Sequence, residues 1–553
     1  MPLIPRRIGL LFAVFLVLLG LAAIRATWLG TVNGATLRNA AATQQAQELH
    51  VPAARGAIVD RRGTELAVSE PADDISATPY LVKDAPKAAK QIAGVLGLDE
   101  ADVLKKLLRR DTGFVYLQRG VPDRRSHELE KLKIPGLTFT PTSRRVYPRD
   151  YTASQVLGQV GVDGKGLSGL EYSMDHLLHG NDGTRRIVRD ALGEAISVRD
   201  PDPAEPGSKL ELTMYSAIQD KTEEVLQEVG AKYTPKGATA VVLDPRNGDL
   251  LALANWPRVD ANNPGAAPDY ARQNRAVGFN YEPGSTFKAF TVAGALEDRK
   301  VTPDTPFNLP PTIHVADREI GESHDRGYIS LTTGGILAQS SNVGSIMIGQ
   351  RLGATRFDQW VRKFGFGKRT GVDLPGEEAG QVLDVKDYSG SSMGNLPIGQ
   401  GISVTPMQMA TGYMAIANGG ILRPTRIVKS VDGRETAMPK GHRVISEKTA
   451  ASVREMLEGV LAPGGTASEA QVPGYKLAGK TGTANKIDEK TGEYSSANYI
   501  ASFVGFAPAK NPKLLVAVMV DEPKGAIYGG EVAAPAFQKI TSFALTYLKI
   551  PPE

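Results

Sequence analysis

The sequence predicts an α+β protein with three parts: an N-terminal apolar helix, an α+β domain, and a larger domain in which helices cover an antiparallel sheet. Three observations predict this fold class. An uncharged run occupies residues 8–24, segments of mixed strand and helix pattern follow to about residue 210, and two hairpin patterns then enclose a long helical region. A chain of 553 residues is too long for one ordinary domain and is long enough for two or three.

The N-terminal apolar run predicts a membrane anchor within residues 1–30. Two arginines precede the run at 8–24, and residues 26–29 lengthen it if Arg25 extends its charge to the membrane surface. A cleavable signal peptide is the alternative, because small residues near the end of the run suit a cleavage site. We favour an uncleaved anchor, since the run is longer than a usual signal-peptide core. In both cases the arginines predict a cytoplasmic N-terminus and an exported remainder.

The composition excludes several kinds of chemistry. The chain is 41% hydrophobic and 22% charged, which is typical of a globular protein, and its net charge of +4 gives no sign of nucleic-acid binding. It has no cysteine, which excludes disulfides, thiolate metal sites and a cysteine nucleophile. No histidine spacing typical of a metal site is present, so we predict neither a metal nor another cofactor.

Residues 31–210 are predicted to form a non-catalytic α+β domain. Residues 31–50 are polar and rich in Ala and Gln, and we expect them to extend the anchor helix as a stalk. The pattern from Arg55 onwards is mixed and includes a helical stretch near 85–109. No cluster of catalytic residue types stands out, so we interpret this domain as a scaffold or an interaction module.

Residues 211–553 are predicted to form the domain with the helix-covered sheet. A helix that stops at a glycine opens it, one hairpin lies near each of its ends, and an amphipathic helix closes it. These elements are expected at 216–229 before Gly230, at 239–243 with 250–254, at 500–506 with 514–520, and at 534–548.

The sequence Tyr-Glu-Pro-Gly-Ser-Thr-Phe-Lys at residues 281–288 contains the candidate nucleophile. Ser285 and Lys288 lie three residues apart, after a Pro-Gly pair that suits a helix start, so both are expected on one helix face. A neutral lysine can take the proton of a serine and so make it nucleophilic. The pattern is weak by itself, because Ser285 could equally cap a helix, and it needs partners elsewhere in the chain.

Two further motifs offer such partners. Ser-Ser-Asn at residues 340–342 supplies a hydroxyl that can relay a proton and an amide that can hold a peptide group. Lys-Thr-Gly-Thr at residues 480–483 can bind a carboxylate, and its glycine can let a substrate backbone approach closely. Taken singly, the asparagine could be a turn former and the glycine a strand kink. Their joint occurrence in one exported domain favours a site.

Three other patterns compete with this interpretation. Residues 474–481 fit the phosphate-binding pattern G-x-x-x-x-G-K-S/T, but Thr-Gly-Thr after the lysine position disfavours the helix that such a loop needs. Residues 390–394 fit the G-x-S-x-G nucleophile pattern, but their surroundings are typical of a loop. His324 lies in a Ser-His-Asp-Arg-Gly segment and is interpreted as a surface histidine.

The motifs S-x-x-K, S-x-N and K-T-G, in this order, resemble those of the penicillin-recognising serine enzymes. The segment 281–288 resembles the whole nucleophile segment of class B penicillin-binding proteins. Further segments similar to that family, including its non-catalytic pedestal, are 55–61, 145–148, 166–171, 399–410 and 417–420. The chain departs from the family pattern at Met214, where an acidic residue is usual, and at Ser168.

The resemblance implies a peptidoglycan D,D-transpeptidase with the penicillin-binding fold, no cofactor, and β-lactams as inhibitors. Ser285 would attack the carbonyl between the two terminal D-alanines of a stem peptide, and an amine of a neighbouring stem would resolve the acyl-enzyme. Lys288 would be the general base, Ser340 would pass the proton to the leaving amine, and Asn342 would hold the substrate amide.

By the same resemblance, Lys480, Thr481 and Thr483 would bind the terminal carboxylate, with Gly482 between them. The backbone N–H groups of Ser285 and Thr483 would form the oxyanion hole. The pKa of Lys288 is expected to be lowered by burial and by the like charge of Lys480.

Relatives within the superfamily fit less well. A β-lactamase would need a group that activates water, a β-lactam-sensing receptor carries several membrane segments, and a non-catalytic scaffold would be expected to lose Ser285 or Lys288. Septal enzymes of the FtsI type and elongation enzymes of the rod complex share the motifs, and the compact pedestal favours the septal type. The implied partners are an FtsW-like (SEDS) glycosyltransferase and other divisome membrane proteins, at the division site of the cytoplasmic membrane.

Overall fold

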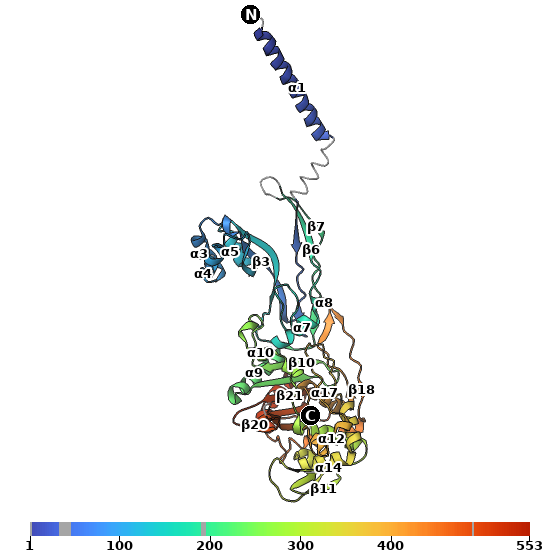
Figure 1. Cartoon of the computed structure of the whole chain (residues 1–553). Coiled ribbons are helices and arrows are strands. Elements are labelled where there is room, and N and C mark those ends of the chain that lie inside the picture. The colour runs from blue at the N-terminus through green and yellow to red at the C-terminus, as the bar shows by residue number, and fades with distance from the viewer. Residues whose placement is uncertain (1–2, 32–45, 190–194, 489–490, 553) are drawn as a thin grey trace. The chain divides into compact units, whose positions relative to one another are not determined.

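The computed structural model describes residues 3–31, 46–189, 195–488 and 491–552 (Figure 1). Contacts between residues divide the chain into two compact units. The first unit takes its residues from 1–54, 71–144 and 180–207, and the second from 55–70, 145–179 and 208–553. The second unit is therefore assembled from three separate stretches of the chain.

The N-terminal helix α1 extends from Leu3 to Thr31. Its part from Ile8 to Thr31 is long and apolar enough to cross a membrane, and its apolar surface is not covered by other described residues. This agrees with the predicted anchor. Of the predicted stalk, residues 32–45 lie outside the described residues, and residues 46–50 belong to strand β1 (Ala46–Val51). The helix expected at 46–50 is wrong, because these residues pair with another strand.

Two structures make up the rest of the first unit. One is an antiparallel sheet in the order β1-β6-β7, with β6 at Gly183–Arg189 and β7 at Ala195–Asp202. The other is an α+β group with its own apolar core. Its elements are η1 (Pro79–Leu81), α3 (Ala85–Leu96), α4 (Glu100–Leu107), β4 (Val115–Pro122) and α5 (Asp123–Glu130), together with parts of β3 (Glu65–Ala77) and β5 (Leu137–Val146).

The helical stretch predicted at 85–109 is two helices rather than one. Helix α3 ends at Gly97, which adopts the left-handed conformation with φ +72°, and α4 begins after Asp99, whose carboxylate accepts from the backbone N–H of Asp102. A left-handed glycine and an aspartate cap end one helix and start the next. The continuous helical periodicity concealed this break.

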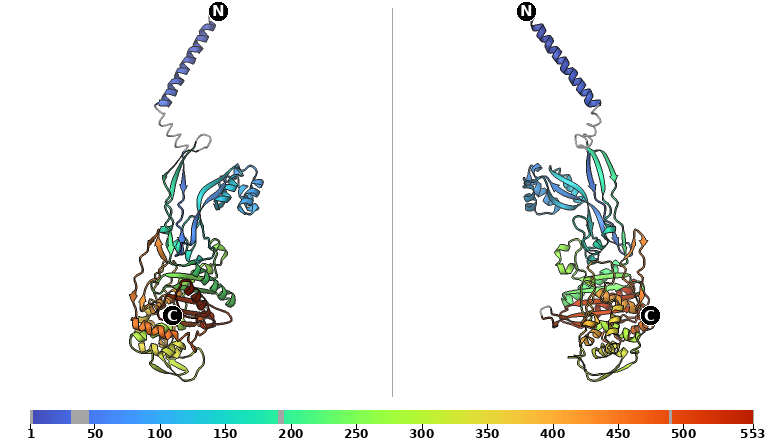
Figure 2. Two further views of the ribbon diagram at one scale, coloured as in Figure 1. Left: turned by 180° about the vertical axis from the view of Figure 1, so that it is seen from behind. Right: turned by 45° about the vertical axis from the view of Figure 1, so that its right-hand side comes forward.

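The second unit is built around a five-stranded antiparallel sheet in the order β10-β9-β21-β20-β19. Figure 2 shows that the C-terminal strands lie beside the green strands β9 and β10, although a long part of the chain separates them. Both predicted hairpins are confirmed, since β9 pairs with β10 and β20 pairs with β21. The bounds are β9 Gly237–Leu243, β10 Leu250–Trp256, β19 Ala478–Ile487, β20 Tyr494–Ala507 and β21 Leu514–Asp521.

Helices cover this sheet in separate groups. Helices α9 (Ser216–Tyr233) and α20 (Ala534–Tyr547) pack against each other and against the sheet. Helix α17 (Pro406–Ala417) is buried along its whole length, between the sheet and α18 (Glu447–Glu458). Helix α20 confirms the closing helix that the sequence predicts at 534–548. The fold is the α+β arrangement expected from the sequence, with an antiparallel sheet covered by helices.

The remaining elements of the second unit surround this core. Three further helices pack around α12, which with the turn before it carries the nucleophile region. The short strands form small hairpins and a sheet in which β8 pairs with β2 and β16. The helices are α6 (Ser154–Leu157), α7 (Gly169–Ser173), α8 (Asp175–Leu178), η2 (Pro264–Ala266), α10 (Asp269–Arg272), α11 (Arg275–Gly278), η3 (Gly284–Phe287), α12 (Lys288–Glu297), α13 (Thr333–Ala338), α14 (Asn342–Leu352), α15 (Ala354–Lys363), η4 (Val385–Asp387), α16 (Ser392–Asn395) and η5 (Leu396–Ile398). The strands are β2 (Ile58–Val59), β8 (Leu210–Leu212), β11 (Pro306–Leu309), β12 (Thr312–Val315), β13 (Arg318–Gly321), β14 (Ile329–Thr332), β15 (Ile421–Leu422), β16 (Val428–Val431), β17 (Arg434–Glu435) and β18 (His442–Arg443).

The end of α9 differs from the prediction. The helix continues through Gly230 to Tyr233 and ends at Thr234, which has φ +39°. A Cβ atom on Gly230 would lie 2.3 Å from the ring of Trp256. The glycine is therefore required for close packing inside the helix, and the prediction that it stops the helix is wrong.

Three separated segments of the second unit converge on the carboxylate of Glu171, which is fully buried. The Nε atom of Arg55 donates to Glu171 Oε2 at 2.5 Å, and the Nε atom of Arg145 donates to Oε1 at 2.7 Å. Arg55 also donates to Asp175 Oδ1 at 2.6 Å. This Glu171 cluster joins the segments near residues 55, 145 and 171 that the sequence singled out.

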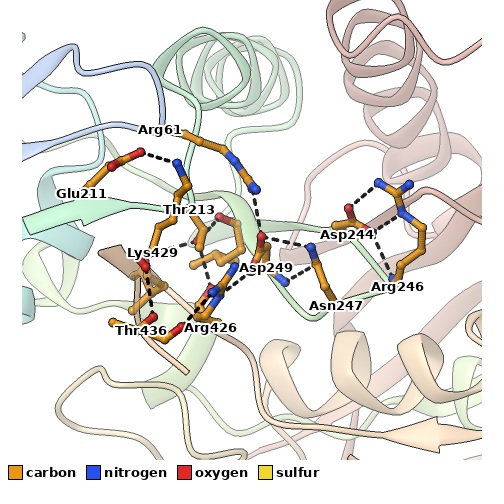
Figure 3. A network of polar contacts seen from close by, with 12 residues as sticks. Arg61, Glu211, Thr213, Asp244, Arg246, Asn247, Asp249, Arg426, Lys429 and Thr436 are labelled. Carbon is orange, nitrogen blue, oxygen red and sulfur yellow. Dashed lines mark hydrogen bonds and ion pairs between the residues drawn. The ribbon is translucent and has the colours of Figure 1, made fainter. Parts of the chain in front are cut away.

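Figure 3 shows a second buried node, at Asp249 beside the β9–β10 turn. Arg61 donates to Asp249 Oδ2 at 2.9 Å, Arg426 donates to Oδ1 at 2.7 Å, and the side-chain amide of Asn247 donates to Oδ2 at 3.1 Å. This Asp249 node ties the turn after β2 to the β9–β10 hairpin and to the segment before β16.

Candidate active site

Ser285 lies on the wall of a cleft of about 690 Å³ in the second unit. It is half-buried in η3, the single helical turn that leads into α12, and Gly284 before it has φ +55°. The same cleft is lined by Ser340, Asn342 and Thr483, as well as by Thr481. The structure therefore brings the three predicted motifs together around one hollow.

The ammonium group of Lys288 lies beneath this cleft and contacts the second motif. Lys288 is fully buried, and its Nζ donates to the backbone oxygen of Ser340 at 2.7 Å and to Asn342 Oδ1 at 2.6 Å. Ser340 Oγ lies 3.4 Å from the same Nζ. Within the described residues, no hydrogen bond joins Lys288 Nζ to Ser285 Oγ. The amine is thus held by the motif that is expected to relay its proton.

Burial lowers the pKa of Lys288 to about 7. Among the charged groups around it, Glu322 raises this pKa and Arg326 lowers it. Burial thus acts as expected, but the like charge of Lys480, which is also expected to lower the pKa of Lys288, is not among the causes of this shift. Repulsion between Lys288 and Lys480 adds to burial in lowering the pKa of Lys480 well below its ordinary value.

Ser340 occupies the turn between α13 and α14 in an unusual backbone conformation. Its φ of +58° lies in the left-handed region, which costs a residue other than glycine roughly 1–3 kcal/mol. The next residue, Ser341, caps α14 by accepting from the N–H of Gly344 at 2.9 Å. The turn aims the Ser340 backbone oxygen at Lys288 and places Asn342 at the first position of α14.

Glu322 supports this turn, and no local sequence signal reveals it. Its side chain is 6% exposed, and its carboxylate accepts from the backbone N–H of Asn342 at 2.6 Å and from Ser341 Oγ at 2.6 Å. Arg326 pairs with Glu322 and also donates to Ser341 Oγ at 2.7 Å. Nothing in the sequence near 322 predicts that it meets α14, because the contact spans a loop.

The third motif lies on strand β19 at the edge of the sheet. Lys480 is fully buried, and its Nζ lies 3.3 Å from both the backbone oxygen and Oγ1 of Thr481. Thr481 Oγ1 also contacts Thr466 Oγ1 at 2.7 Å, and Thr483 Oγ1 accepts from the N–H of Gly529 at 3.1 Å. The two hydroxyls therefore face the cleft from one strand, and the buried amine of Lys480 lies beneath them.

Gly482 is required for packing within the protein. A Cβ atom there would lie 2.4 Å from Ser502 Oγ, 2.9 Å from Thr286 Cγ2 and 3.0 Å from the backbone oxygen of Pro283. The missing side chain lets β19 lie against the turn that carries Ser285. The close approach expected here for a substrate backbone is made, on this side of the strand, by the protein itself.

The competing patterns do not form their sites. Lys480 lies inside a strand, so no phosphate-binding loop with a following helix exists at 474–481. Residues 390–391 form a turn and residues 392–394 belong to the short helix α16, without a strand leading in. His324 is exposed, as expected, and it stands at the cleft with its ring centroid 5.2 Å from that of Tyr528. The described part of the chain contains no group of three or more side chains that could hold a metal ion.

Two protein families match the chain. The transpeptidase domain of penicillin-binding proteins matches residues 238–542, and the penicillin-binding protein dimerisation domain matches residues 50–212. The first match covers the region of all three motifs.

Curated relatives and solved structures agree with these matches. The chain is 36% identical to penicillin-binding protein PbpB of Mycolicibacterium smegmatis, over 97% of this chain and 89% of the relative. It is 32% identical to peptidoglycan D,D-transpeptidase FtsI of Escherichia coli, over 99% of this chain and 92% of the relative. A crystal structure of penicillin-binding protein 3 from Mycobacterium tuberculosis, complexed with aztreonam, is 32% identical and covers 91% of this chain and 98% of that one, with a TM-score of 0.71.

Proposed function

The chain belongs to the class B penicillin-binding proteins of the FtsI type, which are peptidoglycan D,D-transpeptidases, and from this premise we propose that Ser285 and Lys288 carry its chemistry. The enzyme cross-links stem peptides through a serine acyl-enzyme and is acylated by β-lactams. The observation that carries the assignment of residues is the buried amine of Lys288, which is held by Ser340 and Asn342 below the cleft that Ser285 lines.

Acylation begins with a proton transfer from Ser285. With a pKa of about 7, Lys288 is neutral in about half of the molecules at pH 7, whereas an ordinary lysine is neutral in only about 0.03%. The neutral amine takes the Ser285 proton as Oγ attacks the carbonyl between the two terminal D-alanines. The backbone N–H groups of Ser285 and Thr483 donate to the developing oxyanion.

Collapse of the tetrahedral intermediate breaks the C–N bond and releases the terminal D-alanine. Ser340 passes the proton from Lys288 to the leaving nitrogen, and its Oγ lies 3.4 Å from Nζ in support of this role. Asn342 holds the substrate amide. The amine of a neighbouring stem then attacks the acyl-enzyme, its proton returns through the same groups to Ser285 Oγ, and the cross-link is an amide bond.

The motif on β19 binds the carboxylate of the terminal D-alanine. The bound carboxylate favours the protonated form of Lys480, which then supplies a positive field from below the strand, while Thr481 and Thr483 donate from their hydroxyls at the cleft. Gly482 lets β19 lie against the Ser285 turn, so the carboxylate site and the nucleophile keep a fixed spacing. The carboxylate of a β-lactam binds in the same place.

The proposal extends to the organisation of the chain. Residues 1–30 are a cytoplasmic tail and a single transmembrane anchor, residues 31–210 are the non-catalytic pedestal, and residues 211–553 are the transpeptidase domain outside the membrane. The apolar helix at Ile8–Thr31 and the two family matches support this division. The enzyme acts at the division septum with an FtsW-like (SEDS) glycosyltransferase and other divisome membrane proteins. Its likeness to FtsI fits the septal role.

Labelling with a fluorescent penicillin tests the nucleophile. We expect full-length protein to form a covalent fluorescent adduct and Ser285→Ala to form none. Ser392→Ala is the matched control, because Ser392 is the serine of the competing G-x-S-x-G pattern, and it should label like the wild type. Labelling of Ser285→Ala at the wild-type rate would contradict the assignment.

Depletion in growing cells tests the septal role. Loss of a septal enzyme should give long cells without septa, and a fluorescent fusion should gather at midcell. Rounded cells and a fusion along the side wall would instead indicate elongation.

A further inference from the structure

The segment 399–413 packs against the turn that carries Ser285, and no step of the proposed chemistry uses it. Its first part, 399–410, is one of the segments that resemble the penicillin-binding family. The segment begins at Gly399, directly after η5, and continues into α17, which is buried along its whole length. Its contacts with residues 281–286 indicate what it contributes to the site.

The backbone before Ser285 is bound to this segment by its peptide groups. Tyr281 and Val404 donate their N–H groups to each other's backbone oxygens, both at 2.9 Å, and the N–H of Gly284 donates to the backbone oxygen of Gly399 at 3.0 Å. A Cβ atom on Gly399 would clash with the backbone oxygen of Gly284. The glycine at 399 therefore lets the two stretches of backbone approach each other closely.

The backbone after Ser285 is bound by a side chain of the same segment. The hydroxyl of Tyr413, on α17, donates to the backbone oxygen of Thr286 at 2.6 Å. Tyr413 is fully buried, and its ring meets that of Phe290 edge-on with the centroids 5.3 Å apart. Burial raises the pKa of Tyr413 well above its ordinary value, so its hydroxyl keeps its proton and remains a donor.

Ser285 thus lies between two backbone groups that are tied to one segment, the N–H of Gly284 before it and the carbonyl of Thr286 after it. These ties matter because η3 is a single 3₁₀ turn, whose own hydrogen bonds have poorer geometry than those of an α-helix. An oxyanion-hole donor has to lie within about 2.7–3.1 Å of the developing charge. A small rotation of the turn would displace both Ser285 Oγ and the Ser285 N–H from the reacting carbonyl.

We propose that Tyr413 is a positioning residue for the nucleophile, and that its hydroxyl holds the Thr286 carbonyl so that Ser285 Oγ and the Ser285 N–H stay aligned for attack. The inference rests on the proposed function. Tyr413 is not among the described residues that line the cleft, so it acts through the turn and not on the substrate. Its hydroxyl should therefore contribute to the acylation step and not to the initial binding of a ligand.

Tyr413→Phe tests this role, because it removes the hydroxyl and keeps the ring that packs against Phe290. Acylation of the full-length protein is followed over a range of benzylpenicillin concentrations, which separates the dissociation constant of the non-covalent complex from the rate constant of acylation. We expect the rate constant to fall about tenfold and the dissociation constant to stay within about twofold of the wild type. The pH midpoint of acylation should remain near pH 7, because the surroundings of Lys288 do not change.

Tyr475→Phe is the matched control. It removes the same group from another hydrogen bond to a backbone oxygen, that of Ile550, which is also 2.6 Å long. Tyr475 is not among the described residues of the cleft lining, so its acylation rate constant should equal that of the wild type. The fraction of molecules labelled at completion is measured for both variants. Partial unfolding lowers this fraction, whereas the rate constant is obtained from the labelled molecules alone.

The outcomes separate the positioning role from the function on which it rests. An unchanged rate constant in Tyr413→Phe, or an equal fall in Tyr475→Phe, would overturn the role while Ser285 still becomes acylated. A rise in the dissociation constant that accounts for the whole loss would overturn it as well. If benzylpenicillin does not acylate the wild type at Ser285, the proposed function itself fails.

Discussion

The Glu171 cluster and the catalytic cleft both contain buried charged side chains in the second unit, but only the Glu171 cluster pairs them with opposite charges. At Glu171, two guanidinium groups meet one fully buried carboxylate at 2.5 and 2.7 Å, so each charge has an opposite partner. In the cleft, Lys288 and Lys480 are fully buried, yet within the described residues no carboxylate lies within ion-pair distance of either ammonium group. The first arrangement compensates each buried charge with an opposite one, whereas in the second burial lowers the pKa of both lysines.

This difference explains what each region can do. A paired cluster fixes chain segments in place, because removal of either partner leaves a buried charge uncompensated. An unpaired buried lysine becomes a base near neutral pH, because only its neutral form is well accommodated. Burial of paired charges at Glu171 therefore fixes chain segments in place, whereas burial of the unpaired Lys288 makes its amine a base.

The strongest test of the comparison removes the unpaired amine. Lys288→Met keeps most of the side-chain volume but cannot accept the Ser285 proton, and loss of a general base typically costs about 10²–10⁴-fold in rate. The rate constant for acylation by benzylpenicillin should fall by that amount, as measured by quenched-flow labelling. Lys476→Met, at an exposed lysine, should acylate like the wild type. An equal fall in both variants would point to a general effect of lysine loss.

Breaking the paired cluster should act on stability. Glu171→Ala leaves Arg55 and Arg145 buried without their shared carboxylate, and breaking such a pair costs about 3–5 kcal/mol. The free energy of unfolding in urea should fall by that amount. Asp269→Ala breaks a surface pair whose carboxylate side chain is 93% exposed, and it should cost less than about 1 kcal/mol. Similar losses in the two variants would contradict the contrast between buried and exposed pairs.

A third prediction concerns the packing that holds the cleft together. Gly482→Ala places a Cβ atom against Ser502, Thr286 and Pro283, and overpacking of this kind costs about 1–3 kcal/mol. Penicillin acylation should fall as well, because β19 must move away from the Ser285 turn. Gly265→Ala, where a Cβ would meet nothing within 4 Å, is the control and should change neither property. A fully active Gly482→Ala would show that this packing does not set the site.

The smallest effect should be a displacement of the pH profile. The wild-type acylation rate should rise with pH and reach half of its maximum near pH 7, because the neutral form of Lys288 is the active one. Glu322 raises the pKa of Lys288, so Glu322→Gln should move the midpoint to lower pH. Arg326 lowers that pKa, so Arg326→Met should move the midpoint to higher pH. Midpoints that shift in the same direction in both variants would exclude this electrostatic account.

Local patterns predicted much of the fold and of the site. The hairpins at β9–β10 and β20–β21 were predictable because their turn residues and apolar runs lie next to each other in sequence. The three motifs were predictable because each is a short stretch of residues whose chemistry is visible without the fold. The resemblance to a known family then assigned their roles, which the structure alone does not test.

The missed features depend on contacts between distant residues. Gly230 looked like a helix stop because its partner, Trp256, lies on a neighbouring strand. Residues 46–50 looked like a helical stalk because their pairing strand, β6, comes far later in the chain. The sequence does not reveal Glu322 for the same reason. Its carboxylate binds the backbone at the start of α14, which begins twenty residues later. Composition and periodicity carry no information about such contacts between residues that are distant in the sequence.

The Asp249 node has a consequence for how the chain reaches its native state. Arg61 is synthesised early, yet its partner Asp249 and the other guanidinium, from Arg426, follow much later in the chain. The segment 55–70 must therefore remain available until most of the second unit has emerged, because domains fold as whole units. A fragment that begins at residue 211 would keep every catalytic motif but would leave the fully buried carboxylate of Asp249 with one guanidinium instead of two. Expression of the catalytic unit thus calls for the early segment to be supplied, either in the same chain or as a separate peptide.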